Sequence, residues 1–245
     1  MHSFGRFLSI LDSVDSTNNY AMQKVHARLA KHGDAWLALQ QTQGKGQRSK
    51  HWITEPGQNI TISFVTEPDF LRPDNSFHLI AAVALGIYDF FKHYAGAETR
   101  IKWPNDIYWR DRKTVGILIE NVIRDKKWLY AVIGVGININ QTDFGAFNAT
   151  SLLCITGKKY DVTTLAKELC GFLDKRYEML KSSAEAILLD YQNALYKLNE
   201  KVIFKKENIT FEAEVLGITN DGSLIVNAGE KMLLTWGSVE WVIEK

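Results

Sequence analysis

Asp106 and Lys113 are the residues of this chain whose types and spacing most directly suggest chemistry. Pro104 cannot donate to a sheet ladder, and the Asn-Asp pair after it favours a turn. An apolar run follows at residues 115–119. We therefore expect a strand, a tight loop and a hairpin with its tip at residues 111–112. Its arms would hold an ammonium and a carboxylate close together as a reacting pair, the simpler alternative being a solvated turn.

A second stretch with functional character is the basic, glycine-rich segment 40–52. It contains two glycines and three cations, namely Gly44, Gly46, Lys45, Arg48 and Lys50. No acidic residue occurs between Asp34 and Glu55. Glycines allow tight turns that expose backbone N–H groups, so amides and cations together could hold an anion. The segment lacks the third glycine of a GxGxxG motif, because Ser49 occupies that position, and a flexible surface loop is the alternative.

Residues 15–18 form a third polar cluster, which supplies helix N-cap candidates before a helical pattern that runs to Leu29 and ends at Gly33. Helix capping is the simplest explanation for Ser16 and Thr17. A helix N-terminus with hydroxyls beside it also suits a carboxylate or a ureido group.

The rest of the chain predicts the elements that must position these residues. Strands are expected at 59–65 and 128–139, and helices at 76–94, 165–180 and 187–198. The second strand carries Gly134, Gly136 and Asn138, and glycines inside a buried strand often mark close approach of a ligand or another backbone. Four short strands are expected at 202–204, 211–216, 223–226 and 232–234. The pattern predicts an α+β body with a small C-terminal barrel.

Composition and charge exclude several classes of protein. The chain has 245 residues, 46% of them hydrophobic and 23% charged, which is typical of a soluble globular protein. A net charge of +1 gives no general affinity for nucleic acid or membranes. The polar first twenty residues do not suit a signal peptide, and the run Leu79–Tyr88 is too short to cross a bilayer. We expect a cytoplasmic protein without a metal site, because six histidines and two cysteines show no ligand spacing.

Four blocks in a fixed order closely resemble the biotin–protein ligases. They are Asp15–Asn18, Gly44–Trp52, Lys102–Asp106 with Lys113–Ile117, and Gly134–Asn138. The resemblance covers almost the whole chain. It implies a mixed β-sheet packed against helices, as in class II aminoacyl-tRNA synthetases and biotin–lipoate ligases. Residues 1–197 would form the catalytic domain and residues 198–245 a small SH3-like barrel. The catalytic body begins within the first fifteen residues, so we expect no winged-helix domain and no DNA binding.

The resemblance implies a reaction in two steps. The carboxylate of biotin attacks the α-phosphate of ATP, with Mg²⁺, to give biotinyl-5′-AMP and pyrophosphate. A lysine of a biotin carboxyl carrier domain of a carboxylase then attacks this mixed anhydride and releases AMP. The resemblance also implies a homodimer, because relatives use the edge of the central sheet for self-association and for carrier docking.

The resemblance also implies roles for individual residues. Lys113 and Asp106 would be catalytic. The biotin-binding residues would be Ser16, Thr17, Asn18, Gln41, Lys45, Gly46, Gln47 and Lys113. The nucleotide-binding residues would be Lys45, Arg48, Trp52, Lys102, Asn105 and Asn138. No cluster of protein ligands would hold a metal, and Mg²⁺ would arrive with ATP, near Asn138.

Two departures from the family pattern concern the glycine-rich loop. Lys45 stands where many relatives carry arginine, and Gln47 replaces a second arginine that helps to close the loop. We therefore expect this chain to retain its adenylate less tightly than relatives that carry the arginine. Two other functions remain open. One is a lipoate–protein ligase, and the other is a non-catalytic module that binds RNA or a peptide.

Overall fold

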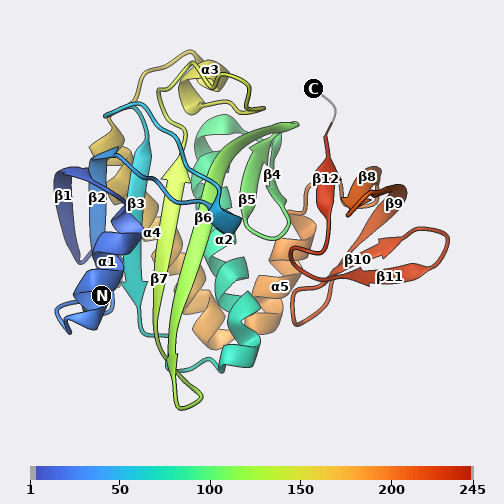
Figure 1. Ribbon diagram of the computed structural model, residues 1–245, viewed down its shortest axis with the longest axis horizontal. Helices are drawn as coiled ribbons and strands as arrows, with labels where there is room; N and C mark the ends of the chain where they lie inside the picture. The colour runs from blue at the N-terminus through green and yellow to red at the C-terminus, as the bar shows by residue number, and fades with distance from the viewer. Residues whose placement is uncertain (1–3, 244–245) are drawn as a thin grey trace.

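The computed structural model describes residues 4–243, which are built around two β-sheets (Figure 1). The larger sheet has seven strands in the order β1-β2-β3-β7-β6-β5-β4. They are β1 (Phe7–Val14), β2 (Asp34–Gln41), β3 (Ile60–Thr66), β4 (Thr99–Lys102), β5 (Asp106–Trp109), β6 (Arg112–Arg124) and β7 (Lys127–Ile137). Strands β1 and β2 pair in parallel, and the other neighbours pair antiparallel. The sheet is therefore mixed, as predicted.

Helices cover both faces of this sheet (Figure 1). They are α1 (Thr17–His26), α2 (Ser76–Ala95), α3 (Leu152–Thr156), α4 (Val162–Ser182) and α5 (Ala184–Asn193), with short 3-10 turns η1 (Gln47–Ser49) and η2 (Pro73–Asn75). Helices α2, α4 and α5 pack against one another on one face. Helix α1 lies on the opposite face, against β2, β3 and β7. The combination confirms the predicted α+β class.

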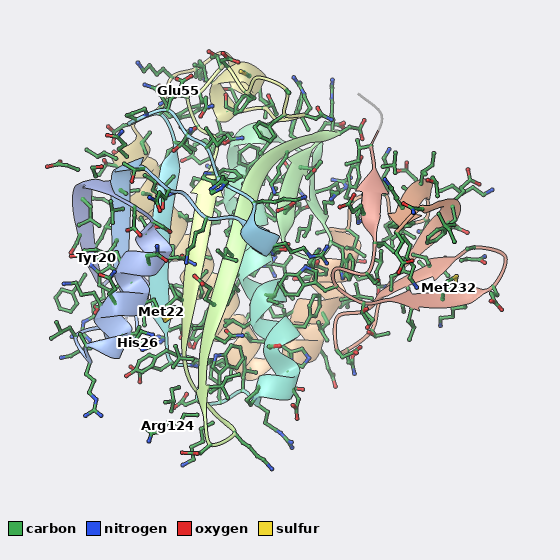
Figure 2. All side chains as sticks on the ribbon, in the orientation of Figure 1. Tyr20, Met22, His26, Glu55, Arg124 and Met232 are labelled. Atoms are coloured by element: carbon green, nitrogen blue, oxygen red, sulfur yellow. The ribbon has the colours of Figure 1, made fainter. Side chains whose placement is uncertain are left out.

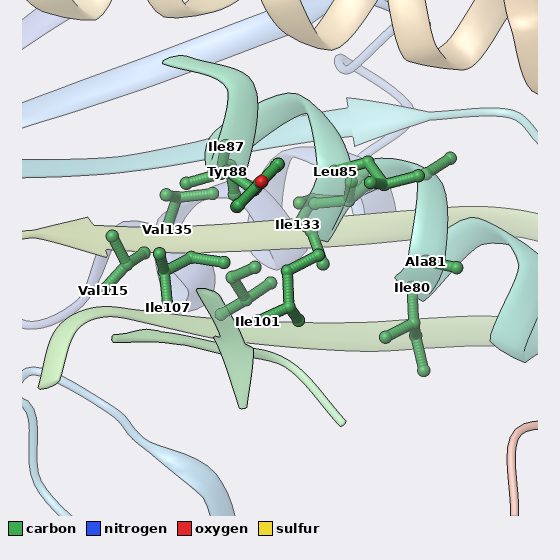
Figure 3. Packing of buried hydrophobic residues seen from close by; sticks show 14 of the residues in the cluster. Ile80, Ala81, Leu85, Ile87, Tyr88, Ile101, Ile107, Val115, Ile133 and Val135 are labelled. Atoms are coloured by element: carbon green, nitrogen blue, oxygen red, sulfur yellow. The ribbon is translucent and has the colours of Figure 1, made fainter. Parts of the chain in front are cut away.

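The main core lies between α2 and the sheet (Figure 3). Leu85 and Ile87 of α2 pack towards Ile133 and Val135 of β7, and all four side chains are buried. The apolar residues of α2 recur at helical spacing, and Gly96 ends the helix with a positive φ of 79°. Burial of each such side chain is worth about 1.5–3 kcal/mol, so this layer fixes the sheet that carries the site.

The alternation along β3 decides which side chains reach the other face of the sheet. Ile60, Ile62 and Phe64 enter the main core, so Thr61 and Ser63 point to the side where α1 packs. Helix α1 covers part of that side through a smaller apolar cluster of Ala21, Val25, Ala30, Trp36, Val65 and Val132. Tyr20, Met22 and His26 mark this helix in Figure 2. The rest of that face is where the polar residues gather.

The smaller sheet is antiparallel, in the order β11-β10-β9-β8-β12. Its strands are β8 (Lys201–Lys206), β9 (Ile209–Ile218), β10 (Leu224–Asn227), β11 (Lys231–Leu234) and β12 (Glu240–Val242). The indole of Trp103 donates to the carbonyl of Gly222 at 2.8 Å and anchors the small sheet to the body. A Cβ on Gly222 would lie 2.1 Å from the Phe77 ring, so only glycine allows this approach.

Most predicted elements are confirmed, with several corrections. The first helix ends at His26, three residues before Leu29, while α3 and β12 were missed because each is only one short turn or strand. The capping prediction is wrong for the side chain of Ser16, which occupies the N-cap of α1 but makes no capping hydrogen bond. Within residues 4–243, no helix is long and apolar enough to span a membrane.

Candidate active site

The predicted pair of Lys113 and Asp106 is present. Lys113 Nζ lies 2.7 Å from Asp106 Oδ1, across the β5–β6 hairpin. The two side chains are 31% and 22% exposed, so both groups are partly shielded and still open to a ligand. A register shift between Ile107 and Tyr108 brings the lysine to this position on the second arm.

Strand pairing places Asp106 in one row of residues that crosses the sheet. Asp106 faces Lys102 on β4 and Gly116 on β6, and Gly116 faces Gly136 on β7. Gly136 in turn faces Thr61 on β3. Directly opposed residues point to the same side of a sheet, so the two glycines form a floor beside the ion pair.

Trp52 lies flat on this glycine floor. A Cβ added to Gly136 would lie 2.3 Å from Trp52 Cε2, and one added to Gly116 would lie 2.9 Å from Trp52 Cζ3. Lys113 Nζ lies 5.8 Å from the centre of the same ring. The buried Trp52 Nε1 has no hydrogen-bond partner among residues 4–243. Glycine is thus required at positions 116 and 136 for the Trp52 ring to pack on the sheet. The indole N–H of Trp52 remains an unsatisfied donor beside the ion pair.

A buried polar network lies where α1 begins. The backbone N–H and the hydroxyl of Thr17 both donate to Gln41 Oε1, at 2.8 and 3.1 Å. Ser63 Oγ on β3 lies 2.8 Å from Thr17 Oγ1 and 2.5 Å from Asn18 Oδ1. Ser16 is buried next to this network. Because the oxygen of Gln41 is held by Thr17, its NH₂ group is the part left to meet a ligand.

Glu120 connects this network to the glycine-rich loop. The side-chain amide of Asn18 donates to Glu120 Oε2 at 2.8 Å. Lys45 Nζ lies 3.9 Å from Glu120 Oε1. A Cβ on Gly134 would lie 2.2 Å from Asn18 Oδ1, so glycine is needed there for the asparagine to fit. The loop lysine and the start of α1 therefore share one carboxylate.

The glycine-rich loop is folded back on itself. Gly46 N–H donates to the carbonyl of Lys50 at 2.7 Å, and Gly44 accepts from Trp52 N–H at 2.9 Å. Gln47 Nε2 donates to the carbonyl of Ile117 on β6 at 3.4 Å. Arg48 is exposed and has a positive φ of 51°. The loop thus presents its cations above the sheet and is tied to it by few hydrogen bonds.

Lys102 is the second cation beside Asp106. Its ammonium lies 5.3 Å from the ring centre of Tyr108 and 5.5 Å from that of Trp241 in the C-terminal sheet. Burial lowers the pKa of Lys102 to about 8, from an ordinary 10.5. The charge of Asp106 opposes this shift, and that of Lys113 adds to it. Lys102 can therefore lose its proton much more easily than an ordinary lysine.

Asn105 and Asn138 are both buried and both hold backbone in place. The amide of Asn105 donates to the carbonyl of Ile117, and that of Asn138 donates to Thr150 at 3.1 Å. The oxygen of each side chain is its remaining polar atom. Among residues 4–243, no group of three or more His, Cys, Asp or Glu side chains could hold a metal ion. One amide oxygen suits an ion that brings phosphate oxygens with it.

The structure brings most of the predicted residues to one face of the sheet. Lys113, Asp106 and Lys102 lie together, with Trp52 between them and the polar network at α1. Sequence reasoning missed Ser63 and Glu120, although Ser63 stands between Ile62 and Phe64 and Glu120 follows the apolar run that ends at Ile119. That alternation was the available signal.

Comparisons with known proteins agree with this geometry. A sequence profile of the Biotin/lipoate A/B protein ligase family matches residues 10–138. The bifunctional ligase/repressor BirA of Bacillus subtilis is 31% identical over 233 residues, which cover 92% of this chain and 71% of that protein. The biotin–[acetyl-CoA-carboxylase] ligase of Mycobacterium tuberculosis is 25% identical over 237 residues, 94% of this chain and 86% of that one.

The fold is shared with solved structures. A biotin protein ligase from Aquifex aeolicus, in complex with biotin and ATP, superposes with a TM-score of 0.82 over 98% of this chain and all of that one, at 22% identity. The Leishmania major enzyme with biotinyl-5-AMP gives a TM-score of 0.64 at 20% identity, over 97% and 98% of the two chains. The profile match and the Bacillus relative show that this chain belongs to the biotin/lipoate A/B protein ligase family.

Proposed function

We propose that this chain is an ATP-dependent biotin–protein ligase, which activates biotin as biotinyl-5′-AMP and transfers it to a lysine of a carrier domain. The observation that carries the proposal is the Lys113–Asp106 pair at 2.7 Å, beside a glycine floor and a polar network. Ligases named for biotin, over 94% of this chain in one case, support the substrate. A structure with biotin and ATP supports the pair of small molecules.

The polar network at α1 suits the ureido ring of biotin. Gln41 offers its NH₂ group to the ureido oxygen, and the hydroxyls of Thr17 and Ser16 are close by. Asn18 is held by Glu120 and Ser63, so it supports the ring's position. The ring of Trp52, seated on the glycine floor, offers an apolar wall for the aliphatic tail. Such a tail would direct the carboxylate towards Lys113.

Lys113 would reduce the repulsion between the two anions that react in the first step. The carboxylate attacks the α-phosphate, a new acyl–phosphate bond forms, and pyrophosphate leaves with its electron pair. Negative charge builds up where Lys113 is placed, and a positioned cation stabilises it. Lys45, Gly46, Gln47 and Arg48 would close over the adenylate and exclude water.

Lys102, Asn105 and Asn138 would serve the nucleotide. Lys102 can meet a phosphate oxygen as a cation or serve as an acceptor when neutral, because its pKa is lowered to about 8. The two asparagines can present amide oxygens once their NH₂ groups are engaged. Mg²⁺ would arrive with ATP and lower the charge of its phosphates. The oxygen of Asn138 is a suitable ligand for that ion.

Asp106 would position the lysine of the carrier in the second step. An ordinary lysine has a pKa of about 10.4, so it must lose a proton before its amine can attack. The amine forms an amide with the biotinyl carbonyl, and AMP leaves. The carboxylate of Asp106 can accept a hydrogen bond from the incoming amine, and a proton can pass to it or to neutral Lys102.

The partner would be a biotin carboxyl carrier domain of a carboxylase. The name of the Mycobacterium relative supports this class of partner. We assign the catalytic work to a domain of residues 1–197 and place an SH3-like domain at residues 198–245, in line with the change from one sheet to the other before β8. The composition of the whole chain fits a cytoplasmic protein. The exposed edge strand β1 fits a homodimer formed through the edge of the large sheet.

Pyrophosphate–ATP exchange on the purified protein, with biotin and lipoate offered separately, tests the proposal. Exchange that depends on biotin alone is expected. Exchange with lipoate would favour a lipoate–protein ligase, which the family description also includes. If neither acid supports exchange, the adenylation chemistry assigned here is wrong.

A further inference from the structure

We propose that the turn Thr235–Ser238 of the C-terminal sheet is a latch for the glycine-rich loop. Trp236 would be a positioning residue that holds Gln47, and thereby the loop, over the site. The contact itself does not depend on the function proposed above. Its effect on adenylate retention does rest on that function.

The first observation is a bridge through one amide. The indole Nε1 of Trp236 donates to Gln47 Oε1 at 3.2 Å. The NH₂ group of Gln47 donates to the Ile117 carbonyl on β6 at 3.4 Å. Gln47 therefore links the loop to both sheets, with its oxygen on the small sheet and its nitrogen on the large one.

The chemistry of residue 47 makes this bridge specific to the chain. An arginine has five N–H donors and no acceptor, so it cannot receive the N–H of an indole. A glutamine has both kinds of group. Gln47, which replaces an arginine of the family pattern, is thus matched to Trp236. The replacement removes a positive charge from the loop and gives the loop a neutral hydrogen bond to the C-terminal sheet instead.

The second observation is the close approach of Gly237 and Arg48. A Cβ added to Gly237 would lie 1.4 Å from Arg48 Nη2. The φ of Gly237 is 85°, which also favours glycine. The guanidinium therefore rests directly on the backbone of the turn. This contact is independent of the hydrogen bond of Trp236 and lies on the next residue of the loop.

The contact is light enough to open. Gln47, Arg48, Leu118 and Trp236 surround a cavity of about 210 Å³ between the turn and the loop. Trp236 is 49% exposed. The two parts therefore meet through a few polar contacts and leave a gap instead of forming a packed core. A latch of this kind can release the loop for substrate entry and hold it over a bound adenylate.

Hydrogen exchange of the peptide 44–52 in the ligand-free protein tests the latch without any catalysis. Trp236→Phe keeps a ring and removes the N–H. One hydrogen bond of ordinary strength corresponds to about a 2- to 12-fold change in the opening equilibrium, so exchange should rise by that factor. Trp128→Phe is the matched control, because its indole donates to Tyr130 away from the loop and should leave this peptide unchanged.

The partner atom is identified by combining variants. In a Gln47→Met background the acceptor is gone, so Trp236→Phe should produce no further change. In Gln47→Glu an acceptor oxygen remains, so Trp236→Phe should still raise exchange. Substitutions of two residues in contact have non-additive effects. The latch would therefore be overturned if Trp236→Phe raised hydrogen exchange equally in the native, Gln47→Met and Gln47→Glu backgrounds, or had no effect in the native protein.

The rate of biotinyl-5′-AMP release separates the latch from the proposed function. Trp236→Phe should speed release by the factor seen in hydrogen exchange. If the hydrogen-exchange results are as expected but no adenylate forms in the native protein or in any variant, the latch stands and the ligase assignment fails. If adenylate forms but neither release nor hydrogen exchange responds to Trp236→Phe, the ligase assignment stands and the latch is wrong.

Discussion

Lys113→Ala should abolish adenylation while leaving the fold almost unchanged. The side chain contacts Asp106 at 2.7 Å and is 31% exposed, so the pair is partly open to water. Such pairs contribute about 0.2–1 kcal/mol to stability. For a chain of this size, 1 kcal/mol corresponds to about 2–4 °C in Tm. The structure therefore predicts a fall in Tm of at most about 4 °C.

The effect on the first chemical step should be far larger. Removing a group that stabilises developing charge typically slows a reaction by about 10²- to 10³-fold. Lys113 is one of two cations next to Asp106, and Lys102 is the other. Lys102 is a poor substitute, because its ammonium is held against the rings of Tyr108 and Trp241. We expect the rate of biotin-dependent pyrophosphate–ATP exchange to fall by at least about 10²-fold.

The assay compares exchange and thermal unfolding in Lys113→Ala and in a control. Lys201 forms a similar ion pair with Glu212 at 2.9 Å on the surface of the C-terminal sheet. Lys201→Ala should lose neither activity nor more than a small part of its stability. Native exchange rates in Lys113→Ala would refute the assigned role. A drop of 10 °C or so in Tm would show that the lysine is structural, against the argument from exposure.

Three further changes test other parts of the site. Gly136→Ala should displace Trp52, because the new Cβ would lie 2.3 Å from the indole ring. The indole fluorescence should then shift and the KM for biotin should rise. An unchanged fluorescence spectrum would contradict the packing of Trp52 on Gly136. Ser63→Ala removes the hydroxyl that lies between Thr17 and Asn18. The KM for biotin should therefore rise about 5- to 30-fold while kcat stays nearly unchanged. An effect on kcat alone would be inconsistent with a role of Ser63 in binding. The folded-state pKa of Lys102 is about 8, below its unfolded value of about 10.5, so between these pH values the unfolded chain binds the extra proton. The free energy of unfolding should therefore rise with pH in this range, by at most about 1.4 kcal/mol per pH unit. Denaturant unfolding should show this slope in the native protein and a smaller slope in Lys102→Met.

The hairpin was predictable because its determinants are local. The turn residues after Pro104 and the apolar run that begins at Val115 lie within about a dozen residues, so a local hairpin places Asp106 and Lys113 on facing arms. The helix α2 was predictable for a similar reason, since its apolar residues recur at a 3.6-residue period. Interactions of this range are encoded in a single window of sequence.

The short elements were less accessible. Helix α3 has five residues and β12 has three, so neither shows a full period of its pattern. The role of Ser16 was also misjudged as side-chain capping. The sequence shows a hydroxyl before a helix, but it does not show that this hydroxyl is buried without capping the helix.

The sequence alone determined the α+β class, the glycine-rich loop, the ion pair across the hairpin and the resemblance that pointed to a ligase. Only the tertiary structure decided how these parts meet. Ser63 reaches the start of α1, and Gln47 reaches Trp236, 189 residues further on. Such contacts depend on strand register and on how two sheets pack, which are set by the burial of many side chains together. No local pattern contains that information, because the two residues of each contact lie far apart in the sequence.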